Sequence, residues 1–534
     1  MAIALVLASA AAAAEETAWR EGIRAAVERI RYNGNAAASG IAAADLVAGF
    51  YERRSFMPAW RDAAKIDSLA ALIADAYADG LDPADYHQQT IEEWRRQQRG
   101  GGAMTPAEWA VFELTLTDAL ISLVHHQRFG KADPLGQHAT WNFRDSAEEA
   151  DTLTVVEAAV GAPSLEASVA EQIPRDAYYR RLRAALATYR QIAADGGWPA
   201  IADGPVLKRG QADERVPMLA KRLAVTGDLD DAEPYAAAAG MDEALEQALR
   251  RFQARHGLEA DGVLGPATLT ALNLPPEHRI QQLRLALERA RWVLGGLGRN
   301  FVVVNIAGFR VYVVADRQIV WESRVVVGKP YQQTPVFRGE LQYLVFNPPW
   351  SVPYSIATRE LLPEIQAQAD WFETHDYEVR DRAGARIDPA TVDWPALPRQ
   401  NFQYLFVQRP GPGNALGQVK FIFPNEHAVY LHDTPARRLF STTERAFSHG
   451  CIRVENPLEL AEILLRPNGW NRPAIDDVLA SGKTSTVWLA EPLPILLLYW
   501  TANVDPDGTV HFYRDVYGRD PPIAKALDGP FRIG

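Results

Sequence analysis

The residue best suited to chemistry is the only cysteine of the 534-residue chain, Cys451, in the segment SHGCIRV at residues 448–454. A thiolate attacks carbonyl carbons when a base takes the thiol proton and backbone N–H groups hold the oxyanion. His432, in the strand-like run 429–434, is a candidate base, and Gly450 permits a tight turn that directs N–H groups at a carbonyl. A lone cysteine is more often a small buried hydrophobe, but this context favours a nucleophile.

The main rival to acyl transfer is a zinc site. It would need three or four of these side chains to converge: His427, His432, His449, Cys451 and His511. Alternation along a strand places Tyr430 and His432 on one face and turns His427 away. No C-x-x-C or H-E-x-x-H spacing occurs, so the sequence favours cysteine chemistry over zinc.

Neighbouring residues offer support for the candidate pair. The imidazole of His432 must be held in one tautomer, by the carbonyl of Asp433 or another backbone oxygen. The carboxylate of Asp433 alternatively supports a turn before Pro435. After the nucleophile, Asn456 as N-cap, proline at the first helical position and glutamate at the third predict a helix that anchors the cysteine loop.

Composition indicates a globular protein of two to four domains, with 48% hydrophobic and 23% charged residues. The net charge of -12 argues against a general nucleic-acid or anionic-membrane binder. Residues 1–14 resemble a secretory signal with an A-x-A cleavage site, and no other segment reaches the ~20 apolar residues of a membrane span. Because no Lys or Arg precedes Arg20, a misplaced start or an alanine-rich helix end remains an alternative. In an oxidising compartment outside the cytoplasm, a sole cysteine has no intramolecular disulfide partner, so a free thiol there is better explained as a reactive group than as a structural one.

Patterning predicts a multidomain α+β protein. Helical apolar spacing over 15–205 predicts a scaffold domain, 206–275 a small three-helix module, and 276–300 a connector helix. Residues 301–534 form a β-rich catalytic domain, with strands expected in these runs: 301–306, 310–314, 319–327, 343–346, 419–423, 487–489 and 495–500. An insertion at about 350–418, with a helical part at 358–369 and few strand signals, is long enough to act as a lid.

The three-helix module closely resembles the peptidoglycan-binding module of many cell-wall enzymes. The matching residues are Phe252, Gln253, His256, Gly257, Leu258, Asp261, Gly262, Val263, Gly265, Thr268, Ala271, Leu272 and Asn273. These residues also have the simpler role of building a helical fold.

His432, a gap of fifteen residues and then the SHGC run at 448–451 resemble the signature of the L,D-transpeptidases, whose catalytic domain is of the YkuD type. The run VVVGKP at 325–330 with Thr334 and Pro335 resembles their earlier strand-and-turn motif. The large periplasmic branch of the family is similar over most of the chain, including Phe50, Tyr51, Arg54, Pro58 and Trp60.

The resemblance implies a sandwich-like β-domain that cross-links peptidoglycan without a metal or cofactor. In the family the cysteine attacks the carbonyl at the L-centre of the third stem residue and expels the terminal D-alanine. An amine of a neighbouring stem then resolves the thioester, which gives a 3→3 cross-link. The implied partners are peptidoglycan stem peptides, and the sequence indicates no protein partner or oligomeric state.

By position, the resemblance makes Cys451 the nucleophile and His432 the base, with the N–H groups of Gly450 and Cys451 as the oxyanion hole. Ser448 and His449 line the site. Many members have asparagine where this chain has Arg453, which binds a substrate carboxylate or pairs with Glu455. Two aromatic residues contact substrate or lid, unless they are core residues: Tyr430 and Trp350.

Two other functions remain open. The same site is an L,D-carboxypeptidase if water reaches the thioester before an amine does. The chain is a wall-binding scaffold if its catalytic domain is inactive, although the intact His432, Gly450 and Cys451 argue against this alternative.

Overall fold

The computed structural model describes residues 2–32, 40–100, 104–143, 152–171, 174, 176–237 and 240–533, with no side chains for 2–14. The chain divides into two units, Met1–Leu297 with Trp500–Gly534, and Gly298–Tyr499. The first is helical and the second is β-rich, so the predicted multidomain α+β class is confirmed. The predicted catalytic range 301–534 differs at its end, because the segment from Trp500 packs with the helical unit.

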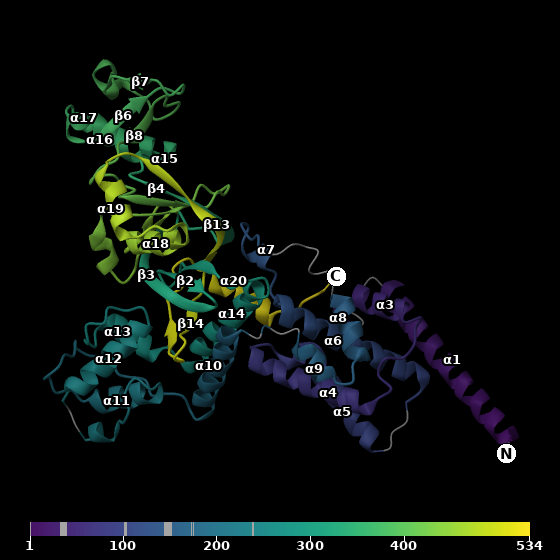
Figure 1. Ribbon diagram of the computed structural model, residues 1–534. Coiled ribbons are helices and arrows are strands. Elements are labelled where there is room, and N and C mark those ends of the chain that lie inside the picture. The colour runs from purple at the N-terminus through teal and green to yellow at the C-terminus, as the bar shows by residue number, and fades with distance from the viewer. Residues whose placement is uncertain are drawn as a thin grey trace. The chain divides into compact units, whose positions relative to one another are not determined.

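The scaffold contains one long, largely buried helix, α6 (Pro106–Phe129). The others are α1 (Ala2–Tyr32), α3 (Ala44–Arg53), α4 (Ala63–Asp75), α5 (Gln88–Arg99), α7 (Pro134–Gln137), α8 (Thr152–Gly161), α9 (Leu165–Ala170) and α10 (Ala177–Ala194), as Figure 1 shows. A capping box between Thr105 and Glu108 starts α6, and Gly130 ends it. Because α1, α3, α4 and α8 all pack on α6, its polar side chains are buried too.

The predicted secretory segment falls on the first half of α1, where the structure describes backbone only. Export therefore stays a prediction. Among the helices of the described residues, none combines the length and the hydropathy that a bilayer crossing requires.

The Tyr51 and Trp60 motif forms a buried polar cluster against α6. The Tyr51 hydroxyl and the Trp60 indole N–H both bind the Thr117 hydroxyl, at 2.6 and 2.9 Å. The Glu113 carboxylate accepts from the Tyr51 hydroxyl and from the backbone N–H groups of Ala59 and Trp60. The motif thus fixes the α3–α4 connection onto the central helix.

The small module consists of α11 (Val216–Val225), α12 (Glu243–Arg255) and α13 (Pro266–Asn273), and α14 (Pro276–Leu294) follows as the connector. Gln253 is the hydrogen-bond centre of the module: its amide donates to Asp261 Oδ1, Val263 O and Thr268 Oγ1, and accepts from the Gly262 N–H. The polar side chains of Gln253, Asp261 and Thr268 are therefore engaged with one another, which supports their structural role.

The C-terminal segment adds β14 (Ala502–Val504), β15 (Val510–Phe512) and α20 (Asp520–Asp528) to the helical unit. The hairpin β14–β15 packs on α10 and α14, where Ala502, Val504 and Phe512 join their buried side chains. This apolar contact explains why the segment belongs to the helical unit.

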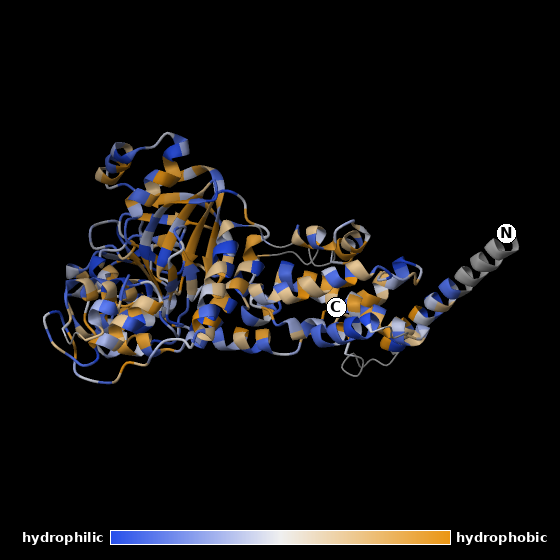
Figure 2. Ribbon diagram, turned by 90° about the horizontal axis from the view of Figure 1, so that it is seen from below, coloured by the Kyte–Doolittle hydropathy of each residue, from blue (hydrophilic) through white to orange (hydrophobic). Residues whose placement is uncertain are grey.

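The β-rich unit contains one nine-stranded mixed sheet in the order β11-β3-β12-β10-β9-β4-β13-β1-β2. The strands are β1 (Phe301–Asn305), β2 (Arg310–Ala315), β3 (Gln318–Gly328), β4 (Phe337–Phe346), β9 (Val419–Ile422), β10 (Leu431–His432), β11 (Ala446–Ser448), β12 (Ile452–Val454) and β13 (Ser485–Leu498). The sheet closes on itself because β2 also pairs with β3. Its strands are largely hydrophobic (Figure 2), and α18 (Pro457–Leu465) packs against β9 and β13 while α19 (Arg472–Ala480) follows it. The run predicted at 487–489 and residues 495–498 of the run predicted at 495–500 belong to the single strand β13, which ends at Leu498.

The insertion is a small α/β subdomain with its own core. Four strands pair in the order β5-β8-β6-β7: β5 (Trp350–Ser351), β6 (Tyr377–Arg380), β7 (Arg386–Ile387) and β8 (Leu405–Gln408). Its helical part comprises α15 (Tyr354–Ile356), a π-helical turn (Ala357–Leu361), α16 (Leu362–Ala367) and α17 (Trp371–Thr374). It has more strand than expected, and its core side chains include Leu362, Trp371, Val379 and Phe406.

The scaffold cluster predicts a pH-dependent stability. Burial raises the pKa of Glu113 from 4.5 to about 7, against the lowering effect of its three hydrogen-bond donors. The folded state therefore binds this proton more tightly than the unfolded state, and the free energy of unfolding should fall as pH rises from 4.5 to 7, by up to about 3 kcal/mol. Urea unfolding followed by circular dichroism at pH 5 and pH 8 measures the change.

In Glu113→Gln this part of the pH dependence should disappear, whereas the exposed Glu92→Gln should retain it. An unchanged pH slope in a folded Glu113→Gln protein would contradict the assignment.

Candidate active site

The parallel pairing of β10 with β12 brings the candidate base and nucleophile onto neighbouring strands. Leu431 pairs with Ile452 and His432 with Arg453, so Cys451 lies beside Tyr430, one step before the ladder. The Ile452 N–H donates to the Tyr430 carbonyl at 3.0 Å and fixes this register. The Tyr430 and His432 rings lie 5.6 Å apart, as expected for side chains on one face.

His432 is buried and held in one tautomer. Its Nδ1 lies 2.5 Å from the Asp433 carbonyl oxygen; because a carbonyl only accepts, Nδ1 carries the proton and Nε2 can accept one. Burial, with the nearby Arg453 as the next cause, lowers the pKa of His432 to about 3. The imidazole is therefore neutral throughout the physiological range.

The Asp433 carboxylate holds the turn that presents this carbonyl. It accepts from the backbone N–H groups of Gln418 (2.8 Å) and Thr434 (2.6 Å) and pairs with Arg437 (2.6 Å). Gly417 has φ +60, and a Cβ there would come within 2.3 Å of the Asp433 side chain. Asp433 thus performs both predicted roles, one through its backbone and one through its side chain.

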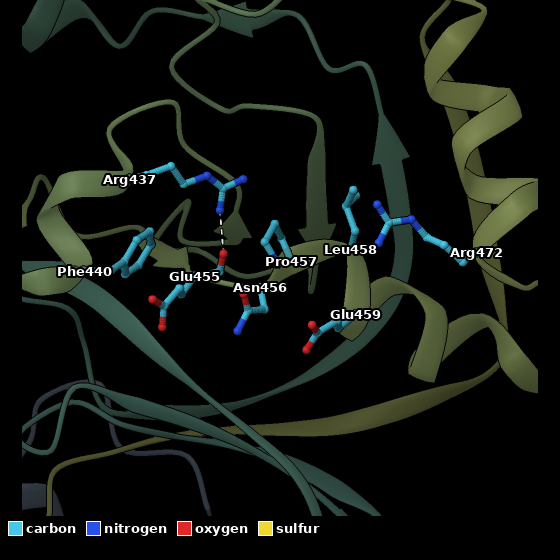
Figure 3. A pocket seen from close by; sticks show the side chains of 8 residues that line it. All are labelled: Arg437, Phe440, Glu455, Asn456, Pro457, Leu458, Glu459 and Arg472. Atoms are coloured by element: carbon cyan, nitrogen blue, oxygen red, sulfur yellow. Dashed lines mark hydrogen bonds between the residues drawn. The ribbon is translucent and has the colours of Figure 1, made fainter.

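Arg437, on the 3₁₀ helix Arg437–Ser441, connects this turn to the end of the nucleophile strand. It also donates to the Glu455 carbonyl at 2.5 Å (Figure 3). Figure 3 shows it at one side of a cavity of about 400 Å³ whose other lining includes Asn456, Pro457 and Arg472. Arg437 therefore clamps the residues that follow β10 and β12.

The nucleophile loop is supported from within and from the β3–β4 turn. Ser448 is buried, and its hydroxyl donates to the Cys451 carbonyl and accepts from the Gly450 N–H at 3.1 Å. The Thr334 hydroxyl donates to the Gly450 carbonyl (2.8 Å) and accepts from the Gly328 N–H (2.9 Å). Gly450 has φ +118, which side chains disfavour. The Gly450 N–H is thus engaged at rest, and no hydrogen bond from the Cys451 N–H is recorded among the described residues.

Cys451 is half-buried and surrounded by cations. Burial raises the pKa of its thiol, and hydrogen bonds from Tyr430 and the charges of Lys420 and Arg453 oppose that shift. Its thiol also lies 3.7 Å from the Ala428 carbonyl. Within the described part of the chain, no hydrogen bond joins the sulfur to His432, so the pair is adjacent but unbonded at rest.

The remaining predicted site residues have different surroundings. His449 points to the insertion, where its Nε2 contacts Glu360 Oε1 at 2.6 Å. Trp350 begins the insertion and packs on its hydrophobic core. Arg453 does not pair with Glu455, whose carboxylate binds Arg324 instead. The Arg453 Nε is buried without a hydrogen-bond partner among the described residues, which leaves it available to a ligand.

The alternation argument was wrong for His427. Ala428 has φ +53 and breaks the strand, so His427 lies in a turn and its ring packs against Phe337 at 4.9 Å. His511 lies in the helical unit and binds Asp505 at 2.7 Å. Among the described residues, no group of three or more His, Cys, Asp or Glu could hold a metal.

The helix after the nucleophile begins as predicted, but its cap differs. α18 starts at Pro457 with Asn456 as N-cap, yet the Asn456 side chain makes no capping bond and contacts Ser323 Oγ at 3.4 Å. Glu459 accepts from the Trp321 indole at 3.1 Å instead of completing a capping box.

Sequence reasoning missed four residues: Lys420, Arg437, Glu360 and the Thr334 hydroxyl as a loop support. Each acts across a tertiary contact, and only Thr334 lay in a recognised motif.

Comparison with known proteins identifies the domains. Residues 299–484 match the model of the L,D-transpeptidase catalytic domain (YkuD), residues 45–186 a scaffold domain, and residues 236–272 a model described as "Putative peptidoglycan binding domain". A Haemophilus influenzae protein described as "Putative L,D-transpeptidase" is 38% identical over 224 residues, which are 42% of this chain and 45% of that protein. The chain thus spans less than half the length of this curated relative.

Among solved structures, the L,D-transpeptidase from Mycobacterium smegmatis is similar at 14% identity and a TM-score of 0.17, over 38% of this chain and 58% of that one. The L,D-transpeptidase from Xylanimonas cellulosilytica (residues 123-326) is similar at 15% identity and a TM-score of 0.17, over 56% and 99%. The similarity to the L,D-transpeptidase family is carried by residues 299–484 and by the curated relative.

Replacing Thr334 with valine should displace the nucleophile loop. The change removes the hydroxyl that satisfies the buried Gly328 N–H and Gly450 carbonyl, which should cost about 2 kcal/mol of unfolding free energy. The rate at which iodoacetamide alkylates Cys451 in the folded Thr334→Val variant should differ from the wild-type rate. The exposed Thr443→Val is the control, and equal stability and alkylation in both variants would refute the role of Thr334.

Proposed function

We propose that this chain, whose residues 299–484 form a catalytic domain of the L,D-transpeptidase family, makes 3→3 cross-links in peptidoglycan through a thioester on Cys451. The observation that carries the proposal is the parallel β10–β12 pairing. It sets neutral His432, whose Nε2 can accept a proton, beside β12, the strand that begins directly after Cys451. A half-buried thiol and a fixed neutral base are what acyl transfer by cysteine requires.

In the proposed acylation, His432 Nε2 takes the thiol proton and the sulfur attacks the carbonyl carbon of the third stem residue. The oxyanion accepts from the Cys451 N–H. As the bond to the terminal D-alanine breaks, the leaving nitrogen takes the proton from His432, and the acyl group remains on sulfur as a thioester. An acceptor amine then attacks the thioester, its proton passes to His432, and the sulfur leaves as the thiol.

Arg453 suits the recognition of a substrate carboxylate. Its Nε is buried without a partner, and an unsatisfied guanidinium N–H in a half-buried site favours an anionic ligand. Stem peptides supply carboxylates beside the scissile bond. In this proposal Tyr430 donates a hydrogen bond to the Cys451 sulfur and Ser448 supports the nucleophile loop. His449 contacts the insertion.

A location at the cell wall of the periplasm is proposed from the module at 206–275. Its match to the peptidoglycan-binding model supports wall attachment. Because Gln253, Asp261 and Thr268 bind one another, glycan contacts would use other residues of its surface.

The insertion is proposed as a cap that decides whether amine or water resolves the thioester. The contact between Glu360, on the π-helical turn, and His449, two residues before the nucleophile, couples the insertion to the cysteine loop. π-helical turns occur frequently at functional sites. A cap held in this way would exclude water from the thioester.

Cys451→Ala should abolish cross-linking, with a loss of about 10³-fold or more, because removal of a nucleophile leaves only binding and oxyanion contributions. Mass spectrometry of the products from tetrapeptide muropeptides measures the effect: dimers report transfer and tripeptides report hydrolysis. Turnover by a folded Cys451→Ala protein would overturn the assignment, and tripeptides alone from wild type would make the protein a carboxypeptidase. No product from wild type would favour the wall-binding scaffold.

Glu360→Gln should shift products from dimers toward tripeptides, because it weakens the contact between insertion and nucleophile loop while leaving the sulfur and base intact. Acylation by a small electrophile such as a carbapenem, followed by intact-mass spectrometry, should change less than the product ratio. Glu364→Gln, on the neighbouring turn and exposed, is the matched control. A product ratio equal to that of wild type would show that the contact has no part in acyl fate.

A further inference from the structure

A transverse row of three basic residues crosses the sheet at the candidate site. Lys420 on β9 pairs with His432 on β10, and His432 pairs with Arg453 on β12. Directly paired residues on adjacent strands have side chains on the same face, at neighbouring positions. The sequence separates these three residues widely, and only the register of three strands brings them together.

Lys420 is held in place without a counterion. Its Nζ lies 3.9 Å from the centroid of the Tyr430 ring, a cation–π contact that directs the ammonium toward the side of the site where Cys451 lies. The side chain is half-buried, and no carboxylate pairs with it among the described residues. A partly desolvated cation without an acidic partner favours an anion nearby.

The sulfur of Cys451 is the group that can become that anion. The charged and titratable groups that act on it come from three strands: Lys420 on β9, Tyr430 before β10 and Arg453 on β12. Lys420 has the larger electrostatic effect of the two cations in lowering the pKa of the thiol. The reverse effect also holds, since Cys451 raises the pKa of Lys420 against the lowering effect of burial.

His432 cannot supply the opposite charge at rest. Its pKa of about 3 keeps the imidazole neutral, and Arg453 and Lys420 both disfavour a third positive charge in the row. A resting ion pair of thiolate and imidazolium is therefore excluded by the same two cations that favour the thiolate.

We propose that Lys420 is a positioning residue of the site, which acts through Cys451: its ammonium, seated on the Tyr430 ring, stabilises the thiolate before and during attack. The role concerns the nucleophile alone, so it holds for transfer, for hydrolysis or for any other reaction of the thiolate.

Alkylation of the full-length protein tests the proposal. Because Cys451 is the only cysteine, intact-mass measurement of iodoacetamide addition as a function of pH reports the thiolate fraction of this one residue. Lys420→Met should move the midpoint of the alkylation profile up by about one pH unit and slow addition at neutral pH about tenfold. Lys420→Arg, which keeps the charge, should restore most of the rate.

Lys483→Met, at an exposed lysine of the same unit, is the control for removal of a positive charge and should match wild type. Circular dichroism confirms folding of each variant. The proposal is overturned if folded Lys420→Met has the wild-type profile, or if Lys420→Arg is as impaired as Lys420→Met. The two proposals can fail separately. If the wild-type protein does not turn over muropeptides but the Lys420 variants show the predicted alkylation shifts, the proposed function is refuted and the role of Lys420 stands.

Discussion

The site depends on a two-residue parallel ladder between β10 and β12. Its register sets Cys451 beside Tyr430 and His432 beside Arg453, and a slip of β12 by one residue would turn Cys451 and Arg453 to the face opposite Tyr430 and His432. Such a short ladder cannot hold its register alone. Arg437 fixes both strands at their C-terminal ends, and Thr334 fixes the loop before β12 through the Gly450 carbonyl. The catalytic arrangement is therefore a property of the supports around the ladder.

Burial then determines the charge state of the site. It raises the pKa of the Cys451 thiol and lowers the pKa of His432, so the resting pair is neutral despite two adjacent cations. A base with so low a pKa takes a proton poorly unless negative charge develops nearby. In the proposed acylation, the oxyanion of a bound carbonyl would supply that charge, so proton transfer to His432 would be favoured when substrate occupies the site.

The sequence predicted the features that depend on local chemistry. The helical character of the scaffold and of the small module, the start of α18 at Pro457 and the Asp433 carbonyl as the partner of His432 all follow from residues a few positions apart. Features that need distant contacts were missed. Ala428 adopts φ +53 and invalidates the alternation expected for His427, and the hairpin β14–β15 packs with α10 and α14 because of its apolar side chains. Lys420 carries no local signal, because only strand register brings it to the site.

The structure of the insertion bears on how it acts. A loop of some seventy residues could close over a site only by ordering itself, at an entropic cost for each residue. This insertion has a core of its own, with Leu362, Trp371 and Phe406, so most of that cost has been met during folding. In the proposed role as a cap it would move as one body. The contact of Glu360 with His449 would then connect that movement to the cysteine loop. The Gly450 N–H, one residue from that contact, is held by the Ser448 hydroxyl at rest, so the proposed oxyanion role falls to the Cys451 N–H alone unless that bond opens.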